Sequence, residues 1–293
     1  MKQTLQALAL VVFAVASNPL SSAQQAHWRR IDLGSSSLTL NGIDPVFGPF
    51  GEIHTQYNGA LGDYAFYDPA SGMQIVAPAG AVTAVSAQAV AGSYTSRSGF
   101  DIQGFQWWPK SNQFFTFQSG AFATTITGQL ADGTVEGWYD DFHFKDYSFI
   151  DTPVLDSSGA VLYYIIHTFA VPNATSTQIL IANDYGRAGT FQGADGSWSG
   201  FVERNGGKLV TLSLPKGAVS ITALGADCYA GFVTRGKNQN QQQAFERCDG
   251  GHADVPIRVG VGGTWIKQIL PSGDLVGYAQ DANGNNFGFV WTR

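Results

Sequence analysis

A small residue followed by phenylalanine recurs six times along this chain of 293 residues. The six phenylalanines are Phe66, Phe105, Phe149, Phe201, Phe245 and Phe289. Successive copies lie 39, 44, 52, 44 and 44 residues apart. Each copy lies in a short run of aromatic and β-branched residues bounded by Gly, Pro, Asn or Asp, which is typical of strands between tight turns. A strand-based repeat of this length indicates the blades of a propeller.

Each repeat divides into four strand-like runs, and the register of these runs is offset along the chain. The last repeat has three runs and stops at "FGFVWTR", whereas the missing fourth run appears near the other end as "HWRRIDLG" (27–34). We therefore predict an all-β fold, a six-bladed β-propeller of four-stranded blades closed by strand 27–34 pairing into the C-terminal blade. Such closure hides sheet edges. A solenoid or an open sandwich is the alternative, but an open solenoid would have no use for the offset.

The N-terminus has the pattern of a secretory signal. Lys2 precedes the apolar run "LQALALVVFAVA", and "SSA" ending at Ala23 fits a small-residue cleavage site. We expect a signal peptide at 1–23 and a single β-propeller domain at 24–293, secreted or periplasmic, with no membrane span after signal removal. An uncleaved membrane anchor is the alternative.

The two cysteines, Cys228 and Cys248, fit an oxidising compartment. Folding "CYAGFVT" against "AFERC" sets them opposite each other, so we predict a cross-strand disulfide, with two free thiols as the alternative. Two lone cysteines do not make a zinc site, and the sequence predicts no metal and no cofactor.

Charge argues against a nucleic-acid partner. The chain carries 16 Lys+Arg against 22 Asp+Glu, a formal net charge of -6. Binding to phosphate backbones needs clustered cations, which a mildly acidic chain with few charges does not offer.

The C-terminal stretch "ILPSGDLVGYAQDANGNNFGFVW" resembles the extracellular HAF repeat. That repeat runs as a glycine-containing turn, a hydrophobic pair with Gly-Tyr, a polar tip and a small-Phe strand. Units at 131–150, 186–203 and 226–248 match more loosely, and none has the His that gives the repeat its name. The resemblance implies an exported bacterial β-repeat protein, and it contributes no catalytic residues.

No metalloprotease, nucleophile-elbow or phosphate-loop motif is present in the sequence. The longest repeat carries "YDDFHFKDY" (139–147), where Asp140, Asp141 and His143 interrupt an ordinary turn. Carboxylates beside a His can act as a general base or bind a cation, so these three are the catalytic candidates. The alternative is a solvated hairpin tip. The same repeat holds an insertion at 151–169 that includes His167.

Aromatic residues supply the ligand-binding candidates. Trp107 and Trp108 are adjacent on a strand-like run, so they point to opposite faces, and one of them is free to stack on a sugar or a partner chain. The alternative is that both belong to the core. His54 and His252 stand alone.

These patterns favour a secreted or periplasmic binding or scaffold protein whose partner is an unknown extracellular ligand or protein. The alternative is an extracellular hydrolase or lyase that acts on a glycan or small molecule at the propeller channel. An enzyme would bring two ionisable side chains together in one concave pocket. A binding module would show an exposed aromatic or apolar patch.

Overall fold

The computed structural model describes residues 27–96, 99, 101–118, 122–143, 145–212, 217–235, 241–249 and 255–292. The predicted signal peptide at 1–23 and the lone His252 lie outside these ranges. The described ranges are all-β, and they contain no helix with the length and apolar character needed to cross a membrane. The predicted all-β class is confirmed.

The strands follow one another in groups of four. The first two groups are β2 (Ser37–Asp44), β3 (Gly48–Tyr57), β4 (Ala60–Tyr67) and β5 (Gln74–Pro78), then β6 (Gly80–Val85), β7 (Val90–Thr95), β8 (Ile102–Trp108) and β9 (Gln113–Phe117). The next two are β10 (Thr124–Gln129), β11 (Val135–Asp140), β12 (Asp146–Leu155) and β13 (Val161–Phe169), then β14 (Ser176–Asn183), β15 (Gly186–Gln192), β16 (Trp198–Arg204) and β17 (Leu209–Leu212). The last two are β18 (Gly217–Leu224), β19 (Cys228–Arg235), β20 (Gln241–Cys248) and β21 (Val255–Ile257), then β22 (Gly263–Ile269), β23 (Leu275–Gln280) and β24 (Asn286–Thr292), with β1 (His27–Ile31) beside β24.

The prediction of six separate four-stranded blades needs a correction. The described strands form a propeller-like arrangement of four four-stranded sheets and one eight-stranded sheet, which runs from β13 to β10, then from β14 to β17. Its halves are joined where β10 and β14 pair in parallel at Gly128 and Ala182. A Cβ on Gly128 would lie 2.4 Å from the backbone nitrogen of Ala182, so the lack of a side chain at Gly128 permits the contact that merges the two halves.

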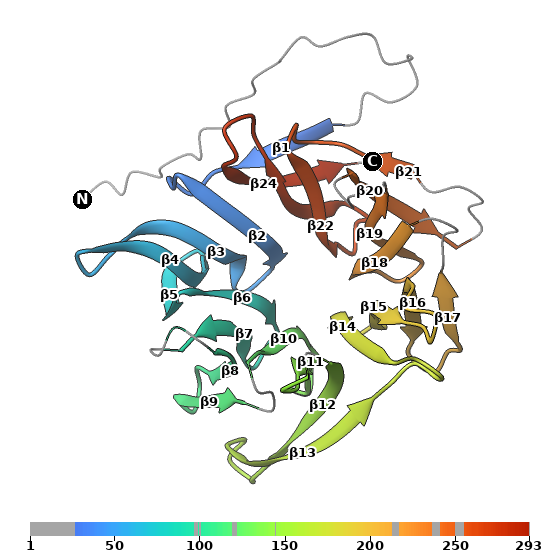
Figure 1. Ribbon diagram of the computed structural model, residues 1–293. Helices are drawn as coiled ribbons and strands as arrows, with labels where there is room; N and C mark the ends of the chain where they lie inside the picture. The colour runs from blue at the N-terminus through green and yellow to red at the C-terminus, as the bar shows by residue number, and fades with distance from the viewer. Residues whose placement is uncertain are drawn as a thin grey trace.

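The sheets stand around a common centre (Figure 1). The first strands of successive groups contact one another in a closed cycle, from β2 through β6, β10, β14, β18 and β22 back to β2. β1 pairs antiparallel with β24, setting Trp28 opposite Trp291 and Arg29 opposite Val290. Closure by the N-terminal strand is therefore confirmed, although the strand ends at Ile31 rather than at residue 34.

One three-residue row builds the core of every group. An aliphatic residue on the first strand pairs with a glycine on the second, and that glycine pairs with the repeated phenylalanine on the third. The aliphatic residues are Leu40, Val82, Ile126, Ile179, Ile221 and Ile266, and the glycines are Gly51, Gly92, Gly137, Gly189, Gly231 and Gly277. All six phenylalanines and all six aliphatic residues are buried, as their predicted packing role requires.

The glycine of each row is needed because the first strand comes too close for a side chain. A Cβ on Gly231 would lie 1.9 Å from the carbonyl oxygen of Ser220, and the other five glycines meet an equivalent oxygen at 2.0 to 2.1 Å. The small residue before the phenylalanine faces the neighbouring sheet: a Cβ on Gly200 would lie 3.0 Å from Val219, and one on Gly288 would lie 3.0 Å from Leu40. The small-Phe pair therefore serves close packing on both faces of its strand.

Each first strand also has a β-bulge directly after the aliphatic residue of its row. The bulged residues are Asn41, Thr83, Thr127, Leu180, Thr222 and Lys267. Four of them donate a side-chain hydrogen bond to a main-chain carbonyl of the next first strand. The pairs are Asn41 to Val82, Thr83 to Ile126, Thr127 to Ile179, and Thr222 to Ile266. Since strands of adjacent groups share few backbone bonds, these side chains help to hold the first strands in place around the centre.

Candidate binding site

The three catalytic candidates lie at the tip of the β11–β12 hairpin. Asp140 accepts hydrogen bonds from the backbone N–H groups of Phe122 and Ala123, at 3.2 and 2.6 Å. Asp141 accepts from the backbone N–H groups of His143 and Lys145, at 2.7 and 3.0 Å. Both carboxylates therefore serve to fold the turn and its neighbouring loop.

The electrostatics of this tip are those of a solvated turn. The backbone N–H of Lys145, supported by that of His143, holds the pKa of Asp141 below its usual range. The His143 ring is exposed and its Nδ1 lies 3.8 Å from Asp141 Oδ2. A general base at neutral pH needs a pKa near the working pH, which Asp141 does not have. The structure brings Asp141 and His143 together, but on an open surface rather than in a pocket.

Sequence reasoning missed an exposed aromatic pair at the same tip. Phe142 is strongly exposed, and its ring meets that of Phe122 edge-on with 6.0 Å between centroids. The signal was available in the sequence, because Phe142 lies between two predicted catalytic candidates.

The two tryptophan candidates lie within the packed part of the molecule. Trp108 is buried, and its Nε1 donates to Gln106 Oε1 at 3.1 Å and to the Tyr164 hydroxyl at 3.3 Å. Trp107 is half-buried and packs on the neighbouring sheet against Tyr67, with 6.1 Å between ring centroids. Both rings thus have core contacts, the alternative that the sequence left open.

A buried polar cluster surrounds Trp108, between the β6–β9 sheet and the β10–β13 half of the eight-stranded sheet. The Gln106 side chain accepts from Tyr164 at 2.5 Å and donates to the carbonyl of Gly133 at 2.9 Å. Asp151 is 2% exposed, its Oδ1 lacks a hydrogen-bond partner among the described residues, and burial raises its pKa to about 7. The buried Gln129 Oε1 is a second such oxygen. A buried acceptor without a donor is costly, and a buried carboxylate more so. A proton on the Asp151 carboxyl removes its charge, and the protonated form therefore stabilises the fold at this interface.

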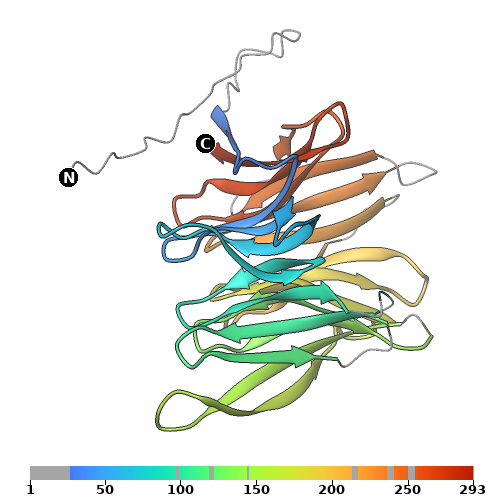
Figure 2. The same cartoon turned by 90° about the vertical axis from the view of Figure 1, so that its left-hand side faces the viewer.

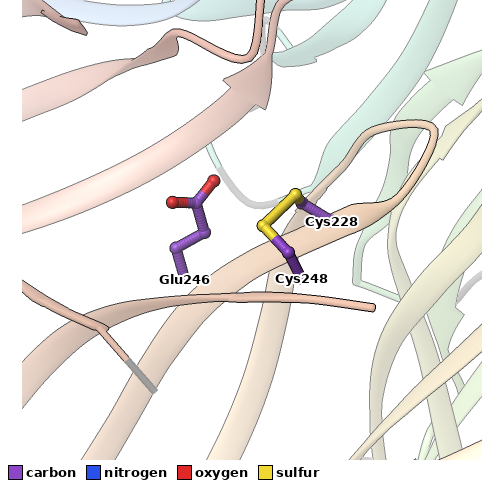
Figure 3. A group of neighbouring side chains, drawn as sticks. All are labelled: Cys228, Glu246 and Cys248. Carbon is purple, nitrogen blue, oxygen red and sulfur yellow. A yellow bond between two sulfur atoms is a disulfide. The ribbon is translucent and has the colours of Figure 1, made fainter. Parts of the chain in front are cut away.

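The predicted disulfide is confirmed. Cys228 and Cys248 are directly opposite on β19 and β20, and their sulfur atoms are 2.09 Å apart. Glu246 points to the same place, and its carboxylate and the two sulfurs lie within 4.8 Å of one another (Figure 3). Because both sulfurs are bonded to each other, neither is a thiolate that can bind a metal ion.

Another ion pair joins the two halves of the eight-stranded sheet. Arg187 on β15 donates two hydrogen bonds to the buried Glu136 on β11, at 2.8 and 3.0 Å, and a third to Glu203 at 3.2 Å. Burial raises the pKa of Glu136, and the Arg187 guanidinium opposes this shift. Arg187 bonds to Glu136 through two parallel hydrogen bonds, and both carboxylates are engaged by the guanidinium. This geometry indicates a structural link between the strands rather than a reactive site.

The strongest surface feature is the β12–β13 hairpin. This hairpin, built by the insertion at 151–169, projects beyond the neighbouring strands (Figures 1 and 2). On its outer strand Leu162 is 61% exposed, Tyr163 57% and Ile166 64%, and Ile165 is exposed as well. The insertion is visible in the sequence, where His167 is the one residue named within it. We call the exposed strand from Leu162 to Thr168 the β13 edge.

The β13 edge differs from the other outer strands. β13 has nine residues, "VLYYIIHTF", without a proline, a glycine or a formally charged side chain. The outer strands β1, β5, β9, β17 and β21 have three to five residues each. β1 carries Arg29 and Arg30, β5 ends in Pro78, and β21 contains Pro256. Short length, proline and charge protect a sheet edge against pairing, and β13 lacks all three. A β-bulge, another such protection, is present at Leu162, and the strand from Tyr163 to Phe169 pairs regularly with β12.

The described residues also form a surface pocket. A pocket of about 370 Å³ lies between the β3–β4 hairpin and β5, lined mainly by Tyr57, Tyr64 and Ile75. Its lining includes the phenols of Tyr57 and Tyr64 but no carboxylate, His, Lys or Cys side chain, so it does not assemble a nucleophile with a base.

Comparisons with known proteins do not place the chain in a family. No protein-family model matches the chain, and a search of curated proteins found no match.

Proposed function

We propose that the chain is an exported six-bladed β-propeller that acts as a binding module and docks a strand-shaped segment of a protein along the β13 edge. The observation that carries this proposal is the nine-residue outer strand with four exposed large apolar side chains and no proline or formally charged residue. Exposed apolar surface of this kind marks interaction sites, and an unprotected edge accepts an added strand through main-chain hydrogen bonds.

Six blades follow if the eight-stranded sheet is counted as two. One bridging pair, Gly128 with Ala182, joins its halves. Each half has the complete aliphatic–glycine–phenylalanine row and bulge that the four-stranded sheets have. The recurring small-Phe strand also supports the proposed relation to the HAF repeat. The disulfide is compatible with an oxidising compartment outside the cytoplasm, and it supports the proposed export.

The alternative function, a hydrolase or lyase acting on a glycan or small molecule, stays a hypothesis without an assembled site. Its named candidates, Asp140, Asp141 and His143, hold a turn on an open surface.

The proposal is tested by photo-cross-linking in the exporting host. A photoreactive amino acid replaces Tyr163 on β13 in the full chain, and in a control it replaces Val210 on β17. Both side chains are more than half exposed, and β13 and β17 are the two edges of the same eight-stranded sheet. We expect adducts from position 163 that disappear when Ile165→Lys is added. Equal adducts from both positions, or none from position 163, would contradict the proposal.

A further inference from the structure

We infer that the occupant of the β13 edge is a second copy of this chain, paired antiparallel along β13 about a twofold axis near Ile165. This inference rests on the proposed function, because it names the partner for the same edge. It is carried by the backbone, side-chain and charge pattern of the strand.

The backbone pattern suits a strand as partner. β12 pairs with one edge of β13 from Ser148 opposite Phe169 to Leu155 opposite Val161. On the other edge, the side chain of Gln113 from β9 accepts from the Val161 N–H at 3.0 Å and donates to its carbonyl at 3.2 Å. That side chain caps the start of the edge, and the stretch from Leu162 onwards continues uncapped among the described residues. The backbone N–H and C=O groups along such an edge can form hydrogen bonds with those of an added strand.

The side-chain pattern suits pairing with itself. Two antiparallel copies centred on Ile165 set Tyr163 opposite His167 and Tyr164 opposite Ile166 of the other copy, and this regular stretch begins after the β-bulge at Leu162. Residues directly opposite each other share a sheet face, so apolar groups of the two copies meet on both faces. A twofold axis makes this contact the same on both chains and closes the assembly at two.

The charge pattern removes the usual obstacle to self-pairing. The chain has a formal net charge of -6, so copies repel one another in general. The β13 edge, however, has no acidic or basic side chain apart from His167. In the proposed register His167 faces Tyr163 and not its own copy, so even its protonated form meets no like charge directly opposite.

Sedimentation of the purified full chain tests the inference. We expect dimers with a dissociation constant below roughly 100 µM. Ile165→Lys should raise that constant at least tenfold, because it puts two cations opposite each other at the axis. The matched control Val210→Lys, on the other edge of the same sheet, should leave the constant unchanged.

Self-pairing and docking of another protein at the β13 edge give different results in these experiments. Wild-type chain that stays monomeric at about 100 µM, or dimers that Ile165→Lys leaves intact, would overturn the self-pairing. If such a monomer still forms photo-adducts from position 163 with another protein, the docking function stands and the occupant is that protein. Adducts of twice the chain mass support the second copy. Circular dichroism of Ile165→Lys confirms that the variant is folded.

Discussion

Replacing Asp151 with asparagine is expected to change how the stability of the protein depends on pH. The Asp151 carboxyl is 2% exposed, its Oδ1 has no hydrogen-bond partner among the described residues, and burial raises its pKa from 3.8 to about 7. The folded chain therefore binds this proton more tightly than the unfolded chain. The resulting stabilisation is complete below about pH 4, declines as the pH rises, and is gone above about pH 7. A shift of about three pKa units corresponds to about 4 kcal/mol.

The assay is denaturant unfolding of wild type and Asp151→Asn at pH values from 4 to 8. Asparagine does not titrate, so the unfolding free energy of the variant relative to wild type should increase by about 4 kcal/mol across this range. Asp156→Asn is the control, because hydrogen bonds from Ser158 and Ala160 lower the pKa of the exposed Asp156 below 3.8, so its carboxylate stays ionised from pH 4 to 8 and its difference curve should be nearly flat. A difference between wild type and Asp151→Asn that does not vary with pH would refute the reasoning.

The core rows and the disulfide give three further predictions, each measured by the free energy of unfolding. Phe201→Ala should lower it by about 3–5 kcal/mol because it empties a fully buried row position, and a loss under 1 kcal/mol would contradict the packing role. Gly231→Ala should prevent folding or lower stability by several kcal/mol, since its Cβ would lie 1.9 Å from the Ser220 oxygen, whereas Gly62→Ala meets nothing nearer than 3.7 Å and should be nearly neutral. Replacing Cys228 and its partner with serine should lower stability by about 3 kcal/mol, and an unchanged unfolding midpoint would count against a formed bridge.

Much of the architecture was predictable because packing repeats leave marks at fixed spacing. The small-Phe pairs identify the third strand of each group, since the phenylalanine must fill a core row and the small residue must admit the neighbouring sheet. The offset of the last repeat predicted the pairing of residues near Trp28 with the final strand. Cys228 and Cys248 could be paired from the register of one hairpin.

Other features depend on three-dimensional contacts that periodicity does not encode. The bridge between Gly128 and Ala182, which merges two groups into one sheet, depends on how closely two first strands approach. A glycine such as Gly189 looks like an ordinary strand glycine until the carbonyl of Gln178 is seen 2.0 Å from the place of its Cβ. Sequence alternation gives the face of a side chain but not its depth.

The candidate site was less predictable than the fold for the same reason. Asp141 and His143 have the residue types of a catalytic pair, but the turn itself uses the carboxylate. The ring of Trp107 reaches the neighbouring sheet, a contact that no local pattern shows. The apolar strand around Ile165 could not be distinguished from a core strand, because the same residues are typical of both.

The most direct test of the closed ring is disulfide trapping between its two ends. Trp28 and Trp291 are directly opposite on β1 and β24. Opposite residues of antiparallel strands have Cα atoms about 4.5–5.5 Å apart, within reach of a disulfide. In the double variant Trp28→Cys, Trp291→Cys, oxidation should form a second disulfide that peptide mass mapping identifies, whereas Trp28→Cys with Gln113→Cys should form none. Two new cysteines that stay open to alkylation while the native pair is oxidised would contradict the closed ring.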